Sequence, residues 1–204
     1  MELTGEPLSL AAIAEVAIAG VPVSLGRAAH ERIDASRRVI EQITNGDTVV
    51  YGVNTGFGKL SEIHIARSDL RELQLNLVRS HACGVGAPLA EAEARAMMLL
   101  RANVLTLGYS GIRREVIELL IAALNRGVYP MIPEKGSVGA SGDLAPLAHL
   151  SLMLVGEGEA FHRGERMPSA AALERAGLAP VTLEAKEGLA LLNGTQAMHA
   201  VGGL

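Results

Sequence analysis

Residues 91–107 are apolar on nearly every side, and this stretch constrains the fold more than any other. Its large apolar residues are not confined to one face of a helix. They are Met97, Met98, Leu99, Leu100, Val104 and Leu105. A helix with such a sequence has to be covered by other elements in most directions, because any uncovered side would expose apolar groups to water. The sequence therefore predicts a helix buried on most sides.

Amphipathic patterns on either side of this stretch predict further helices. Apolar residues recur at steps of three and four over 24–45, with Ser24 as the N-cap, and again over 68–81 and 112–125. Four helices before residue 127 indicate a mainly α fold. With 204 residues and 49% hydrophobic content, the chain can bury the core of one domain, and we expect residues 1–204 to form it.

Two glycine-rich segments interrupt the helical pattern. Residues 48–53 are short and β-branched, so we expect an extended segment that carries Tyr51 into the loop 54–58. Residues 136–142 form the second segment, and Asp143 after them can cap a helix that reaches residue 154. A loop that feeds a helix N-terminus is the expected result.

The last third of the chain predicts smaller elements. Residues 159–166 suggest a β-hairpin around Arg163-Gly164, and residues 169–176 and 185–192 suggest short helices. The sequence ends at 200–204 in apolar residues without a capping signal, so we expect a chain that is cut off.

Composition and charge argue against several classes of partner. A net charge of -4 and 2% aromatic residues do not suit nucleic-acid binding. Because Cys83 is the only cysteine, we expect a reducing, cytoplasmic setting and no cysteine zinc cluster. His30-Glu31 lacks a second histidine at the spacing of a zinc site, so no metal is expected.

Acidic residues before the apolar stretch 8–21 argue against a signal peptide, and no run is long enough to predict a membrane span.

Ala140-Ser141-Gly142 permits an unusual backbone reaction. If the Gly142 nitrogen attacks the Ala140 carbonyl, a five-membered ring closes with loss of the carbonyl oxygen as water, and loss of the Ser141 hydroxyl as a second water leaves an exocyclic methylene. Glycine suits the attacking position because it has no Cβ, and serine supplies the leaving hydroxyl. A following helix N-terminus would favour negative charge on the ring. The alternative is an ordinary glycine-rich turn that starts a helix.

Residues 139–149, Gly-Ala-Ser-Gly-Asp-Leu-Ala-Pro-Leu-Ala-His, closely resemble the signature of the aromatic amino acid ammonia-lyases and aminomutases. Two further blocks match in the same order, at 51–58 and 191–195. In that family the tripeptide becomes 4-methylidene-imidazol-5-one (MIO). The resemblance implies an N-terminal helical domain of the ammonia-lyase, aspartase-like fold, with a small β-hairpin and the MIO loop at a helix N-terminus. It also implies a homotetramer, whose central helical bundle would begin where this chain stops.

The same resemblance implies roles for individual residues. Tyr51 would be the base that removes the substrate β-proton, which requires surroundings that stabilise phenolate. Asn193 would hydrogen-bond the MIO group. Family members that act on histidine have Ser-His where this chain has Ser80-His81, so His81 would bind the substrate imidazole. The residues alone favour a histidine satisfied by the dipole at a helix C-terminus, and it is the family resemblance that reverses this preference. We expect Cys83 and His149 to be structural.

The implied reaction is elimination of ammonia from L-histidine to give trans-urocanate. Whether the substrate amine or its imidazole ring attacks MIO stays open. Relatives are more than twice as long, and their later helices supply a second tyrosine, an arginine and a glutamate, so we expect this piece alone to be inactive. Two alternatives remain: a tyrosine or phenylalanine lyase or aminomutase, and a truncated, non-catalytic helical module.

Overall fold

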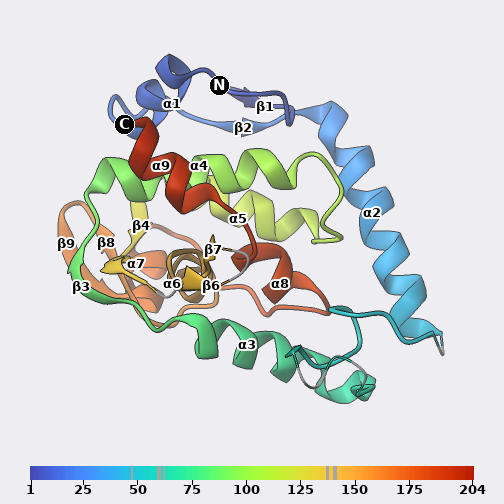
Figure 1. Ribbon diagram of the computed structural model, residues 1–204. Helices are drawn as coiled ribbons and strands as arrows, with labels where there is room; N and C mark the ends of the chain where they lie inside the picture. Colours follow the sequence, from blue (N-terminus) through green and yellow to red (C-terminus); the bar gives the residue numbers. More distant parts are fainter. Residues whose placement is uncertain (47, 59–60, 62, 137, 140–141) are drawn as a thin grey trace.

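The structure is a computed structural model that describes residues 1–46, 48–58, 61, 63–136, 138–139 and 142–204. It is mainly α, with several short strand pairs at the edges of the helices (Figure 1). The helices are α1 (Leu10–Ala17), α2 (Arg27–Asn45), α3 (Leu70–His81), α4 (Glu91–Leu105), α5 (Arg114–Asn125), α6 (Ala145–Leu154), α7 (Ser169–Arg175), α8 (Glu187–Leu192) and α9 (Gln196–Gly203), with a 3-10 turn over Arg67–Asp69 before α3. The strands are β1 (Glu2–Leu3), β2 (Ser24–Leu25), β3 (Val85–Pro88), β4 (Val128–Pro130), β5 (Pro133–Lys135), β6 (Val138–Gly139), β7 (Gly142–Asp143), β8 (Glu159–His162) and β9 (Glu165–Pro168).

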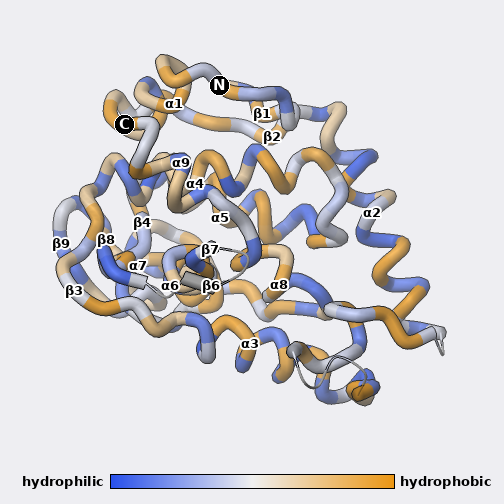
Figure 2. Tube along the Cα trace, in the orientation of Figure 1, coloured by the Kyte–Doolittle hydropathy of each residue, from blue (hydrophilic) through white to orange (hydrophobic). Residues whose placement is uncertain are grey.

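Helix α4 lies at the centre of the core, as its sequence predicts. It packs against α1, α5 and α9, and Met97, Met98 and Leu99 are fully buried. The outer helices are amphipathic, and Figure 2 shows hydrophobic and hydrophilic residues alternating along α2 and α3. None of the helices that the structure describes is long and apolar enough to span a membrane.

Helix α2 begins later than predicted, at Arg27 with Gly26 as the N-cap, so the prediction that Ser24 caps it is wrong. Ser24 instead lies in β2, which pairs in parallel with β1. The Ser24 amide donates to the Met1 carbonyl, and the Gly26 amide donates to the Leu3 carbonyl. Pairing with the N-terminal residues thus holds Ser24 in an extended strand, and the helix can start only after it.

The extended segment predicted over 48–53 is also wrong, because the chain turns here. The Val53 amide donates to the Val50 carbonyl, which closes the turn. The Asn54 side chain accepts from the Val50 amide and donates to the Thr48 carbonyl, at 2.8 and 2.9 Å. An asparagine that satisfies the backbone locally removes the need for a partner strand.

The hairpin predicted around Arg163-Gly164 is confirmed. β8 and β9 pair antiparallel from Glu159↔Pro168 to His162↔Glu165, and β4 adds a third strand beside β8. Both turn residues have positive φ, 54° at Arg163 and 78° at Gly164, as a two-residue hairpin turn requires. The predicted short helices are present as α7 and α8.

The two chain ends lie side by side on α4 (Figure 1). The sequence analysis did not predict α1 or α9, yet both helices pack on α4. A methyl group placed on Gly203 would lie 3.4 Å from Cδ2 of Leu10, so the two helices come close to each other.

Candidate active site

The loop before α6 is closed by a short antiparallel pair, with Val138 opposite Asp143 and Gly139 opposite Gly142. The predicted prosthetic-group residues Ala140 and Ser141, which lie between these strands in sequence, are outside the described residues. The pairing nevertheless fixes the two ends of the segment that contains them.

Gly142 has a backbone conformation that favours glycine. Its φ is +88°, in the left-handed region that residues with a Cβ rarely adopt. Among the described residues, leaving out its chain neighbours, no heavy atom lies within 4 Å of the position of a Cβ here, so the left-handed conformation is what favours glycine. The residue type that the cyclisation needs at the attacking nitrogen is therefore also the type that the backbone requires.

Asp143 connects this loop to α6. Its Oδ1 accepts a hydrogen bond of 3.0 Å from the Ala145 amide, although Leu144 occupies the N-cap position itself. A Cβ on Gly136 would collide with the Asp143 carboxylate, so the loop folds closely over this side chain. The predicted helix that follows the loop and reaches residue 154 is confirmed, but Asp143 is not its N-cap as predicted: it lies one residue before the cap and reaches the Ala145 amide from there, and Gly142 precedes it.

His81 is the last residue of α3 and is half-buried. Its Nδ1 lies 2.8 Å from the Leu77 carbonyl oxygen, which can only accept, so Nδ1 carries the proton. In the neutral ring Nε2 is then an acceptor, and within the described part of the chain it has no hydrogen-bond partner. The ring is therefore both anchored at the helix end and able to accept a hydrogen bond from a ligand.

The segment after His81 is tied to α6 through His149. The Gly84 amide donates to Nε2 of His149 at 3.1 Å. Burial lowers the pKa of His149, and the nearby Asp143 carboxylate opposes this only in part. A neutral His149 can accept the Gly84 hydrogen bond, which is the structural contact expected of it.

Tyr51 lies in the turn before the second glycine-rich loop, with its side chain 58% exposed. Its ring meets Phe57 edge to face, with centroids 6.0 Å apart. The neighbouring Gly52 packs on α8, because a Cβ there would lie 2.8 Å from Cδ2 of Leu189. No described residue hydrogen-bonds the Tyr51 hydroxyl, so the described chain does not supply the phenolate-stabilising contacts predicted for it.

Asn193 follows α8 as its C-cap, and its amide donates to the Leu189 carbonyl at 3.1 Å. Its side chain is exposed. Since Leu189 also contacts the turn beside Tyr51, α8 brings these two predicted site residues into one neighbourhood.

Arg101, which the sequence analysis did not single out, holds the turn after Asn193. Its side chain is 3% exposed, and burial lowers its pKa to about 10. The guanidinium donates to Oε1 of Gln196 at 2.9 Å and to the Ala190 carbonyl, so it links α8 to α9. Gly194 leaves room for it, because a Cβ there would collide with Nη1. An arginine within a helix that is apolar on nearly every side was the available signal.

Glu187 was also missed and anchors the other end of α8. It is completely buried, and its carboxylate accepts from Nε and Nη2 of Arg113, both at 2.8 Å. The backbone amides of Glu184 and Arg113 donate to the same carboxylate at 2.7 and 3.0 Å. A buried carboxylate with this many donors fixes where α8 begins.

The structure brings these site segments together through three helices. α3, α6 and α8 pack against one another in all three pairs (Figure 1). His81 ends the first, Gly142 precedes the second, and Asn193 follows the third. Among the described residues, no group of His, Cys, Asp and Glu could hold a metal ion.

Known proteins resemble this chain in sequence and in the arrangement of helices. A family model described as aromatic amino acid lyase matches residues 8–204. The chain belongs to this family. It is 60% identical over 204 residues to a histidine ammonia-lyase of Stigmatella aurantiaca, covering all of this chain and 40% of that protein. It is 62% identical over 205 residues to a histidine ammonia-lyase of Sorangium cellulosum, again covering 40% of it.

Solved structures of the family share the fold. Histidine ammonia-lyase from Trypanosoma cruzi superposes with a TM-score of 0.92 at 43% identity, covering 99% of this chain and 39% of that one. Phenylalanine aminomutase of Pantoea agglomerans gives 0.93 at 40% identity, covering 100% and 39%. The predicted mainly α ammonia-lyase fold is thus confirmed. The chain spans about 40% of the length of the curated relatives that it matches.

Proposed function

We propose that this chain is the N-terminal, MIO-bearing part of an enzyme that eliminates ammonia from L-histidine to give trans-urocanate. The observation that carries the proposal is the 60% identity, along the whole chain, to a protein named histidine ammonia-lyase. The fold itself does not separate substrates, because a phenylalanine aminomutase and an ergothionase superpose as well as a histidine lyase does. Sequence identity and the Ser80-His81 pair favour histidine.

The proposed prosthetic group would form from Ala140, Ser141 and Gly142. The left-handed backbone of Gly142 and its place before α6 support this, because both suit a condensing glycine nitrogen. The group would supply an electrophilic carbon that helps the amine of the substrate to leave.

His81 is proposed to select the substrate. With Nδ1–H directed at the Leu77 carbonyl, Nε2 can accept the N–H of a substrate imidazole. A leucine at this position could not make that bond. The geometry therefore supports preference for histidine over phenylalanine or tyrosine.

Tyr51 is proposed to remove the β-proton, and Asn193 to hydrogen-bond MIO. A phenol with an ordinary pKa of about 10 needs positive or donor groups nearby to act as a base. The described residues offer the Tyr51 hydroxyl no such partner. We propose that a later part of the full-length polypeptide or another subunit of a homotetramer supplies that partner, which fits the greater length of the relatives.

The proposed setting is histidine degradation in the cytoplasm, for which the single cysteine, Cys83, is the supporting feature. Cys83 is exposed and unpaired, as a thiol can remain in a reducing compartment.

The test is a urocanate and ammonia assay on the complete polypeptide, with histidine, phenylalanine and tyrosine as substrates. Urocanate and ammonia should appear in equal amounts from histidine, and a Ser141→Ala variant should form neither above background. Faster turnover of phenylalanine or tyrosine would favour the lyase or aminomutase alternative. No turnover of any of the three would favour the non-catalytic module.

A further inference from the structure

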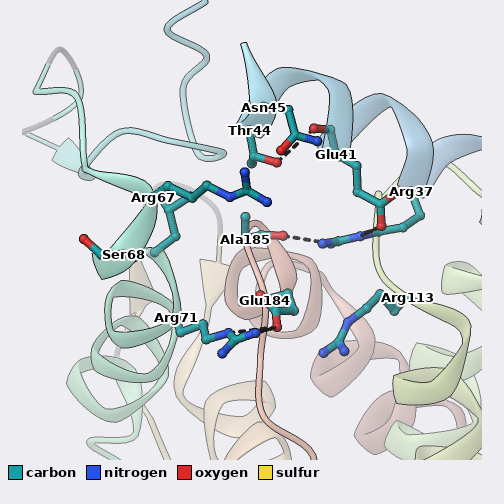
Figure 3. A pocket seen from close by; sticks show the side chains of 11 residues that line it. Arg37, Glu41, Thr44, Asn45, Arg67, Ser68, Arg71, Arg113, Glu184 and Ala185 are labelled. Atoms are coloured by element: carbon teal, nitrogen blue, oxygen red, sulfur yellow. Dashed lines mark hydrogen bonds and ion pairs between the residues drawn. The ribbon is translucent and has the colours of Figure 1, made fainter. Parts of the chain in front are cut away.

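A polar cavity of about 510 Å³ lies where the end of α2, the start of α3 and the segment before α8 meet (Figure 3). It is separate from the candidate active site, because it opens at the start of α3 whereas His81 ends that helix. The two ends are about 17 Å apart along the axis, at about 1.5 Å per residue. Nothing in the proposed lyase chemistry uses this cavity.

Four arginines and two glutamates line the cavity, which gives it a surplus of positive charge. Three of the arginines have carboxylate partners. Arg71 pairs with Glu184 at 2.6 Å, Arg37 with Glu41 at 3.2 Å, and Arg113 with the buried Glu187. Arg37 and Arg113 form a fixed wall, whereas the Arg71 side chain is 66% exposed.

Arg67 is different, because its guanidinium has no hydrogen bond or ion pair with any described residue. Figure 3 shows the side chain extending into the cavity toward Thr44 and Asn45 at the end of α2. The cavity therefore holds a complete, unengaged guanidinium fork beside a hydroxyl and an amide. Such a fork matches two oxygens of an oxyanion.

The wall around Arg67 is already ordered before any ligand arrives. The Arg37 and Arg113 side chains are only 11% and 22% exposed and both meet the same buried carboxylate of Glu187. Arg37 also donates to the carbonyls of Gly111 and Ala185, at 3.2 and 3.0 Å. An anion that enters would therefore not have to order the Arg37 and Arg113 side chains, which lowers the entropic cost of binding.

We propose that this cavity binds the phosphate group of a small organic molecule. A phosphate has more oxygens than the two that one guanidinium takes, and the Asn45 amide can donate to another. The carboxylates of Glu41, Glu184 and Glu187 offset the three paired arginines, so the positive charge left in the cavity is that of Arg67 and an anion is the ligand it suits. The volume falls within the roughly 300–1,000 Å³ of small-molecule sites, which leaves room for an organic remainder.

The test is isothermal titration of the 204-residue chain with inorganic phosphate and separately with glycerol 3-phosphate, at constant ionic strength. Arg67→Gln should weaken binding by about tenfold or more, since it removes the bidentate contact. Arg27→Gln is the matched control: it removes the same charge from an exposed arginine at the other end of α2, about 27 Å away, and should leave binding unchanged.

Tighter binding of glycerol 3-phosphate than of inorganic phosphate supports an organic phosphate as the ligand, whereas equal binding overturns that part of the proposal. Absence of saturable binding, or equal weakening by both substitutions, overturns the site itself. Circular dichroism of both variants checks that the exposed substitutions leave the fold intact.

Discussion

At the scale of single residues, His149 makes the chain's stability depend on pH. Burial holds the pKa of His149 below its ordinary value of 6.5, and the Gly84 hydrogen bond needs the neutral ring. Below pH 6.5 the unfolded chain therefore binds a proton that the folded chain does not, which favours unfolding. We expect the free energy of unfolding to fall from pH 7 to pH 5, by at most about 1.4 kcal/mol per pH unit from this group.

The measurement is urea unfolding at several pH values for the chain and for His149→Gln, which can still accept from Gly84 but does not titrate. The other five histidines stay in both proteins, so the difference isolates His149. The variant should lose less stability on acidification. Parallel curves would contradict the assignment.

His81 allows a prediction about specificity in the complete enzyme. His81→Leu should lower kcat/KM for L-histidine by about tenfold or more, because the substrate imidazole loses its acceptor, and should raise relative activity on phenylalanine or tyrosine. His199→Leu is a matched control, because the Nδ1 of His199 also lies 2.8 Å from the carbonyl four residues earlier, in Thr195. An equal loss in both variants would show that His81 serves only its helix.

The elements of this fold were predictable from sequence where they carry a long periodic pattern, as in α2, α3, α4 and α5. The sequence also predicted the β8–β9 hairpin through its Arg163-Gly164 turn. What it missed depends on particular hydrogen bonds and contacts that no periodic pattern encodes, some between distant segments and some local. Ser24 is extended because residues 1–3 lie beside it, and residues 48–53 turn because Asn54 binds their backbone. The short helices α1 and α9 have a place only because α4 lies beneath both.

In the candidate site, too, the residues can be read from the sequence whereas their contacts cannot. Arg101 and Glu187 are visible in the sequence as charged residues within apolar helices. Only the fold shows that Arg101 donates to the Ala190 carbonyl and that Glu187 pairs with Arg113. The roles expected of Tyr51, Asn193 and His81 came from family resemblance, not from the pattern of residues.

Helix α8 should depend on its buried carboxylate. Glu187→Ala leaves Arg113 and two backbone amides without their acceptor, and removing one partner of a buried pair costs about 3–5 kcal/mol. Glu165→Ala is the control, because its 2.7 Å pair with Arg175 is exposed on both sides and should cost about 1 kcal/mol or less. Urea unfolding of both variants gives the comparison, and similar losses would refute a special role for Glu187.

At the scale of the whole molecule, the 204-residue chain should not form urocanate. It covers about 40% of its relatives, and the described part of the chain leaves the Tyr51 hydroxyl without a hydrogen-bond partner. An absorbance assay for urocanate on the purified chain tests this. Sustained production of urocanate would show that residues 1–204 contain a complete site.

Intact-mass measurement of the complete polypeptide shows whether residues 140–142 condense into an electrophile. Condensation expels two waters, so the protein should be about 36 Da lighter than its sequence, with the loss located in the peptide that contains Ser141. Ser141→Ala should abolish at least the loss of the water that comes from the Ser141 hydroxyl. A complete enzyme that releases ammonia from histidine while Ser141 keeps its full, unmodified mass would contradict the account.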